Sequence, residues 1–223
     1  MIDNFDLIKP LFYFNEANNI FFHCQIVCRA KDHPGQKLQG GVHKTYFVRS
    51  REHLEQLKEE IITLCNLYGA RAYINPAGKD FSSVQTLLLM KIASDIHQGN
   101  VRNPRRCLNS AAGECKSRAP RWVVDIDNLD DKAAVLKWLT EYYKQHIKDK
   151  YAILKIGNNM WEATKSYYII AEIPTNQGCH LIVQPFNLGE FQKSFPTIDV
   201  HKNSMGTLLY MPDLKKMETD LTM

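Results

Sequence analysis

Hydrophobic and polar positions in the first hundred residues follow both strand and helix periods. The run after Ser50 places apolar residues at helical spacing and stops at Gly69, which is the usual signature of a capped amphipathic helix. We expect an N-terminal α/β subdomain over residues 1–100. Its expected elements are strands at 21–30, 44–50 and 70–76 and helices at 51–68 and 83–98.

The last hundred residues have a more definite order of elements. The pattern predicts, in turn, a strand at 121–127, a helix at 130–147, strands at 166–174 and 179–185, a short helix at 187–195 and a strand at 197–202. This β-α-β-β-α-β order is typical of ferredoxin-like and RRM-like sheets. We therefore expect an α+β fold class, with an RRM/ferredoxin-like sheet in the C-terminal half and an N-terminal α/β elaboration. With a last strand at 207–211, the prediction is a single domain, 1–223, whose second subdomain spans 121–211.

That order predicts where polar side chains gather. In a sheet of this kind the first strand lies antiparallel between the third and the fourth, so its end lies beside their starts. The first strand ends in Asp125 and Asp127, the third begins at His180, and the fourth carries Asp199. We expect these four candidate catalytic residues at one edge of the sheet.

Carboxylates on one face of a sheet repel one another unless protons or cations neutralise them. Asp125 and Asp127, two residues apart on a strand, point to the same face. With Asp199 they form a candidate site for one or two Mg²⁺ or Mn²⁺ ions, which prefer oxygen ligands. Such a site suits phosphoryl transfer.

His180 follows the turn TNQG at 175–178, and it is placed to reach the phosphates of a nucleotide. Gly178 would let the backbone approach that ligand closely. The alternative interpretation is structural, because a single histidine at a strand start is more often part of the fold. An Asp-x-Asp at a strand end is often only a loop cap.

Charge is modest overall, with a formal net charge of +4, but one segment is strongly basic. Residues 102–121 hold six cations against the single acid Glu114, and a solvated basic loop is as good an interpretation as a phosphate-binding one. The candidate nucleic-acid-binding residues in it are Arg102, Arg105, Arg106, Lys116 and Arg118, and Arg121 is a candidate for contacting the nucleotide phosphates.

The six cysteines are expected to be free, buried thiols, since no pair has the two-residue spacing typical of a zinc knuckle. No apolar run is long enough to span a bilayer, because Lys91 and Asp95 interrupt the best candidate. The acidic start lacks the features of a secretory signal. These patterns predict a cytoplasmic protein without a membrane partner.

Three short motifs resemble those of the archaeo-eukaryotic primase superfamily, which includes the primase-polymerases. VVDID at 123–127 is similar to its first motif, GCH at 178–180 to its second and ID at 198–199 to its third, in the family's order. The resemblance implies that Asp125, Asp127 and Asp199 hold the metals. It also implies that His180 contacts the phosphate of the incoming nucleotide. Lys202 is a further candidate for phosphate contact, although no motif assigns it that role.

The resemblance implies a metal-dependent nucleotidyltransferase that joins nucleoside triphosphates to a nucleic-acid 3′ hydroxyl. Its partners would be nucleoside triphosphates, single-stranded or primed nucleic acid and other replication proteins. The chain also resembles small phage-encoded proteins, which implies a phage-infected bacterial cell. Two alternatives stay open: a two-metal nuclease, and a non-catalytic nucleic-acid-binding module with the same sheet.

Overall fold

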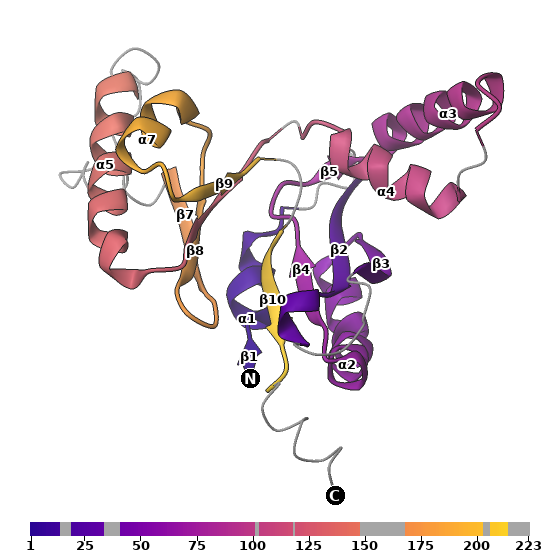
Figure 1. Ribbon diagram of the computed structural model, residues 1–223, viewed down its shortest axis with the longest axis horizontal. Coiled ribbons are helices and arrows are strands. Elements are labelled where there is room, and N and C mark those ends of the chain that lie inside the picture. Colours follow the sequence, from indigo (N-terminus) through magenta and orange to yellow (C-terminus); the bar gives the residue numbers. More distant parts are fainter. Residues whose placement is uncertain are drawn as a thin grey trace, which may run out of the picture. The chain divides into compact units, whose positions relative to one another are not determined.

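A computed structural model describes residues 1–13, 19–33, 41–100, 103–117, 119–147, 168–202 and 206–213. The chain forms two compact units. Unit 1 comprises Met1–Pro120 with Asn203–Met223, and unit 2 comprises Arg121–Lys202. Each has an antiparallel sheet with helices, so the expected α+β class is confirmed (Figure 1).

Within the residues described, unit 1 contains a six-stranded sheet of order β1-β10-β4-β2-β3, with β5 paired to β2. Its strands are β1 (Ile2–Asp3), β2 (Ile20–Cys28), β3 (Gly41–Val48), β4 (Arg71–Ile74), β5 (Lys79–Asp80) and β10 (Thr207–Met211). Its helices are α1 (Phe5–Ile8), α2 (Arg51–Tyr68), α3 (Phe81–His97) and α4 (Pro104–Glu114), with 3₁₀ turns η1 (Lys9–Leu11) and η3 (Ala30–Asp32). The α3 and α4 helices lie side by side (Figure 1).

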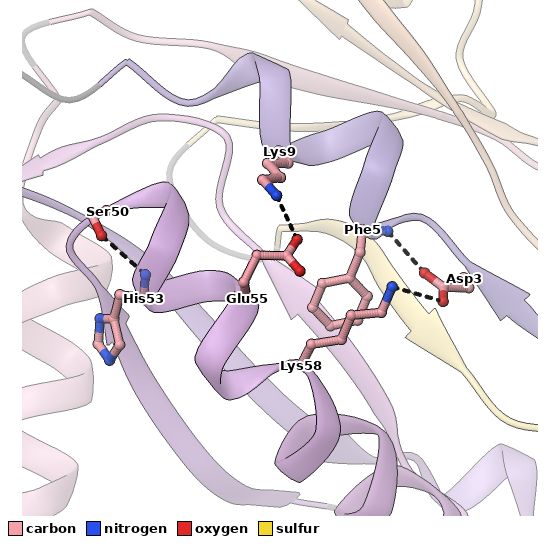
Figure 2. Close-up of polar contacts among 7 residues, drawn as sticks. All are labelled: Asp3, Phe5, Lys9, Ser50, His53, Glu55 and Lys58. Atoms are coloured by element: carbon pink, nitrogen blue, oxygen red, sulfur yellow. Dashed lines mark hydrogen bonds and ion pairs between the residues drawn. The ribbon is translucent and has the colours of Figure 1, made fainter.

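Helix α2 begins and ends where the sequence predicts. The Ser50 hydroxyl accepts a hydrogen bond from the backbone N–H of His53 at 3.0 Å, which satisfies one of the donors left free at a helix start (Figure 2). Gly69 ends the helix in the left-handed region, with φ of 57°. Helix α3 begins at Phe81, two residues earlier than expected, because Asp80 caps it by accepting from the N–H of Ser83 at 2.8 Å.

The N-terminal segment is held to α2 by charged side chains, as Figure 2 shows. Lys9 Nζ lies 2.7 Å from Glu55 Oε1, and Lys58 Nζ lies 3.5 Å from Asp3 Oδ2. The Lys58 ammonium also lies 5.0 Å from the centre of the Phe5 ring, which is fully buried. These contacts connect β1, α1 and η1 to α2 across a long separation in sequence.

Unit 1 also buries polar groups between its sheet and α4. Lys79 is fully buried, and its ammonium donates to the backbone carbonyl of Cys115 at the end of α4. Burial lowers the pKa of Lys79. Burial and the charge of Lys79 together lower the pKa of His23, on β2, to about 4, against a hydrogen bond with Asn109 that raises it. Lys79 thus belongs to the interior of the unit, and His23 is half-buried.

Unit 2 contains a four-stranded antiparallel sheet of order β7-β8-β6-β9 within the residues described. Its strands are β6 (Trp122–Ile126), β7 (Ile169–Pro174), β8 (Cys179–Val183) and β9 (Asp199–His201), and its helices are α5 (Leu129–Ile147) and α7 (Leu188–Ser194). The boundary expected at residue 211 is wrong. The last strand, β10, pairs with β4 and β1 in the sheet of unit 1, so unit 2 ends at Lys202.

One face of the unit 2 sheet packs on α5 and α7 (Figure 1). The core there includes Val124 and Ile126 from β6, Leu181 from β8, Leu139 from α5 and Phe191 from α7, all at most 1% exposed. Since side chains alternate along a strand, residues 123 and 125 point to the opposite face. Among the residues described, no helix is both long enough and apolar enough to cross a membrane.

Candidate functional site

The central strand of unit 2 brings three predicted site residues together. β6 lies between β8 and β9, and both pairings are antiparallel. Asp125 is directly opposite His180 on one side and Asp199 on the other. Directly opposed residues of an antiparallel pair share a face, with Cβ atoms about 4.5–5.5 Å apart. The three side chains therefore form one row across the sheet, on the face away from α5 and α7.

His180 and Asp125 form the closest pair in that row. His180 Nε2 lies 3.3 Å from Asp125 Oδ1, and the side chains are 8% and 26% exposed. This contact orients the imidazole of His180 toward the carboxylate. His180, at the start of β8, therefore contacts Asp125, and it is also a predicted phosphate-binding residue.

The other two carboxylates are exposed. Asp127 is the first residue after β6, and Asp199 opens β9. Asn128 follows Asp127 and accepts from the N–H of Asp130 through its side chain, at 3.1 Å, where α5 begins. The short connection between β6 and α5 places Asp127 near a helix N-terminus, whose partial positive charge favours anions.

Divalent ions would fit the chemistry of this donor set, which has three carboxylates at one end of a sheet. In the part of the chain that the structure describes, however, no group of three or more His, Cys, Asp or Glu side chains lies close enough to hold a metal ion. A metal site made of Asp125, Asp127 and Asp199 requires these carboxylates to be drawn closer together than they lie here.

Gly178 has a structural role that the sequence does not reveal. A Cβ added there would lie 1.8 Å from the Ile126 carbonyl oxygen and 3.1 Å from the Asp127 carbonyl carbon. The turn is closed by the Thr175 N–H donating to the Gly178 carbonyl at 3.0 Å and by the Gly178 N–H donating to the Thr175 hydroxyl at 3.1 Å. Glycine is therefore needed for the turn to pass over the end of β6, directly beside Asp127.

The two candidates for extra phosphate contact flank β6. Arg121 precedes the strand and is half-buried. The Lys202 ammonium lies 4.8 Å from the centre of the Trp122 ring, a distance typical of a cation–π contact. Trp122 packs with the core on the helix-covered face, so Lys202 is directed toward the face opposite to Asp125.

Sequence reasoning missed His201. It lies on β9 directly opposite Val123, two residues beyond Asp199, and so shares the face of the site row. The sequence signal for it is the alternation of side chains along a strand. This alternation places residues 199 and 201 on one face, just as it does residues 125 and 127.

The basic segment forms helix α4 over most of its length, and not the loop that its charge pattern also favours. Cys107, Ala111 and Cys115 recur at helical spacing and are buried, and this spacing was the missed signal. Arg106 on α4 and Lys116 after it are exposed, as a nucleic-acid contact requires. Arg105 lies within α4, and Arg102 and Arg118 lie outside the described residues.

All six cysteines are buried and free, as predicted. Burial raises the pKa of Cys24, Cys65 and Cys179 from the ordinary thiol value. A thiol with a raised pKa is a poor nucleophile at neutral pH. These residues act as small apolar side chains.

No protein-family model, curated protein or solved structure matches this chain. The resemblance to primase-polymerases therefore rests on the three short motifs and on the arrangement of their residues.

Proposed function

We propose that this protein is a metal-dependent nucleotidyltransferase of the primase-polymerase type. It would join nucleoside triphosphates to the 3′ hydroxyl of a nucleic acid. The observation that carries the proposal is the register that places Asp125 between His180 and Asp199. The strand order β7-β8-β6-β9 also has the central first strand of an RRM/ferredoxin-like sheet, which supports the same assignment.

In this proposal Asp125, Asp127 and Asp199 hold Mg²⁺ or Mn²⁺. The bound ions would stabilise the charge that develops on the phosphates and lower the pKa of the attacking hydroxyl. The side chains of the protein hold the reacting groups in position. Asp125 orients the His180 ring, which donates an N–H to a phosphate oxygen of the nucleotide.

Glycine at 178 supports this site by keeping the turn before His180 close to the end of β6. Arg121 and Lys202 are proposed as further phosphate contacts. Lys202 would have to leave the Trp122 ring to reach a nucleotide on the face of Asp125.

Nucleic acid is the second proposed substrate. Exposed Arg106 and Lys116 are proposed to contact its phosphates, together with Arg102, Arg105 and Arg118. The setting is proposed to be the cytoplasm of a phage-infected bacterial cell, with replication proteins as partners.

A non-catalytic nucleic-acid-binding module is the second candidate. The specific observation in its favour is that, among the described residues, the carboxylates are not gathered into a metal-binding group. In such a module His180 and Asp125 would simply stabilise the sheet.

Primer extension tests the proposal. Labelled nucleotides are supplied to the protein with a primed single-stranded template and Mn²⁺ or Mg²⁺. We expect incorporation that falls at least about 100-fold in Asp125→Ala/Asp127→Ala, since these carboxylates would hold the metal ions that stabilise negative charge in the transition state. The matched control is Asp130→Ala/Asp131→Ala, which removes two exposed acids of the next helix and should retain activity.

Each outcome separates the candidates. Incorporation that only the first double variant loses supports the transferase. Cleavage of the primer without any need for nucleoside triphosphates would indicate a nuclease. Nucleic-acid binding without metal binding or incorporation would favour the non-catalytic module.

A further inference from the structure

A second row of side chains crosses the same face of the sheet, beside the row formed by Asp125, His180 and Asp199. One step back along β6, Val123 is opposite Ile182 on β8 and His201 on β9. Val123 and Ile182 are at most 1% exposed, whereas His201 is half-buried. His201 is therefore the polar and partly exposed member of this second row.

Register also separates the two histidines. His180 lies on one side of β6 and His201 on the other. Neighbouring strands are about 4.8 Å apart and each residue advances about 3.3 Å along a strand. The Cα atoms of the two histidines, two strands and two residues apart, are thus roughly 12 Å from each other. Each ring is therefore nearest to ligand atoms on its own side of β6.

Lys202, the next residue in the chain, cannot make the same contact as His201. Lys202 is directed to the other face, where its ammonium lies over the Trp122 ring. On β9, the basic side chain on the face of Asp125 and Asp199 is therefore His201.

Phosphoryl transfer requires the attacking and leaving oxygens to be roughly in line on opposite sides of the phosphorus. If His180 holds the nucleotide phosphates on the β8 side of Asp125, the attacking 3′ hydroxyl approaches from the β9 side. The nucleic-acid strand that carries this hydroxyl has backbone phosphates of its own, which lie beyond the metal ions held by Asp125 and Asp199. A hydrogen-bond donor on the β9 side would hold one of these phosphates and so position the strand.

We propose that His201 is a substrate-binding residue that donates an imidazole N–H to a backbone phosphate of the nucleic-acid strand to be extended. This inference rests on the proposed function, because it takes the nucleotide to bind on the His180 side. The two histidines then have separate roles: His180 binds the nucleotide and His201 binds the nucleic-acid strand.

Equilibrium binding measurements, made without turnover, test these separate roles of His180 and His201. Fluorescence anisotropy measures the affinity for a labelled primer–template in Mg²⁺, and a separate titration measures the affinity for a nucleoside triphosphate. In His201→Ala we expect nucleic-acid affinity to fall about 10-fold, as for a lost hydrogen bond to a charged group, with nucleotide affinity unchanged. His180→Ala should show the reverse pattern.

Two further variants make the test specific. His201→Gln keeps an N–H donor and should recover most of the lost affinity, which a purely structural role of the ring would not predict. His146→Ala is the matched control, because His146 is an exposed histidine on α5, stacked on Tyr142. It should leave both affinities unchanged.

The inference is overturned if His201→Ala binds the primer–template like the wild type, or if it loses nucleotide affinity instead. Its failure can be distinguished from failure of the proposed function. A wild type that extends primers while His201→Ala keeps the same KM for primer would retain the function and reject the role of His201. A wild type that extends nothing, but whose nucleic-acid binding still depends on His201, would reject the transferase and retain the contact.

Discussion

The two units place polar side chains in opposite circumstances. In unit 1, Lys79 and Asp80 lie inside the fold: Lys79 donates to the Cys115 carbonyl, and Asp80 accepts from the first turn of α3. In unit 2 they lie on one face of a sheet, where Asp125 and Asp199 are directly opposed as like charges. Like charges in directly opposed positions destabilise a sheet.

This difference separates structural polar residues from candidate functional ones. A buried polar group with a hydrogen-bond partner is explained by the fold, since burial without a partner costs free energy. The opposed carboxylates of unit 2 cost free energy, and the fold does not need them. Binding of a positively charged ligand, or of a ligand that brings metal ions, would offset this unfavourable free energy. The comparison predicts that altering the buried polar groups should destabilise unit 1, whereas removing one of the opposed carboxylates should stabilise unit 2.

The largest effect is expected from His23 in unit 1. Its pKa is about 4 in the folded protein, against an ordinary value of 6.5, because it is buried near Lys79. Above pH 6.5 the ring is neutral in both states and its contribution to stability is complete. As the pH falls from 6.5 toward 4, the unfolded chain takes up a proton that the folded protein does not, so stability falls, by at most about 3 kcal/mol.

Urea unfolding followed by circular dichroism between pH 4 and pH 7 measures this slope. His23→Gln should flatten it, and His146→Gln, which alters an exposed histidine of α5, should keep it. An identical slope in wild type and His23→Gln would show that other groups dominate the acid sensitivity.

The next effect concerns Gly178, whose absent Cβ gives room to the Ile126 carbonyl. Gly178→Ala forces the end of β6 to shift, and we expect a loss of about 1–3 kcal/mol in the free energy of unfolding. Tryptophan fluorescence measures it, because Trp122 on β6 and Trp138 on α5 lie in unit 2. Activity should fall as well, since Asp127 adjoins the displaced peptide.

Gly113 is the control for this change. It lies in α4, and a Cβ added there meets nothing within 4 Å. Gly113→Ala should be neutral or should stabilise by roughly 0.5–1 kcal/mol, because alanine is a better helix former. If Gly178→Ala were equally well tolerated, the turn would not constrain the end of β6.

The smallest effect has the opposite sign. Asp199→Asn removes the like-charge pair with Asp125, so without metal the free energy of unfolding of unit 2 should rise by about 0.2–1 kcal/mol. Added Mg²⁺ should stabilise the wild type more than this variant. The control is Asp131→Asn at the start of α5, where loss of a favourable interaction with the helix N-terminus should destabilise slightly. A stability loss in Asp199→Asn would mean that Asp199 is a structural residue.

Much of the site arrangement was predictable from the sequence because the signals are local. Alternation along 121–127 places Val124 and Ile126 on one face and Asp125 on the other, and β6 follows that pattern. Ser50 and Gly69 mark the ends of α2 because caps depend on residues next to the helix. The proximity of Asp125, His180 and Asp199 followed from the order of the elements in unit 2.

Other features depend on residues far apart in the chain, and only the tertiary structure decided them. Strand β10 has the apolar composition of any buried strand, and its membership of the unit 1 sheet depends on its pairing with β4 and β1. The need for glycine at 178 comes from the carbonyl of Ile126, more than fifty residues earlier. The direction of Lys202 depends on Trp122, and the position of His201 in the row beside the site depends on its register with Val123. Local patterns determine which face of an element a residue occupies, whereas the packing of distant segments determines what that residue meets.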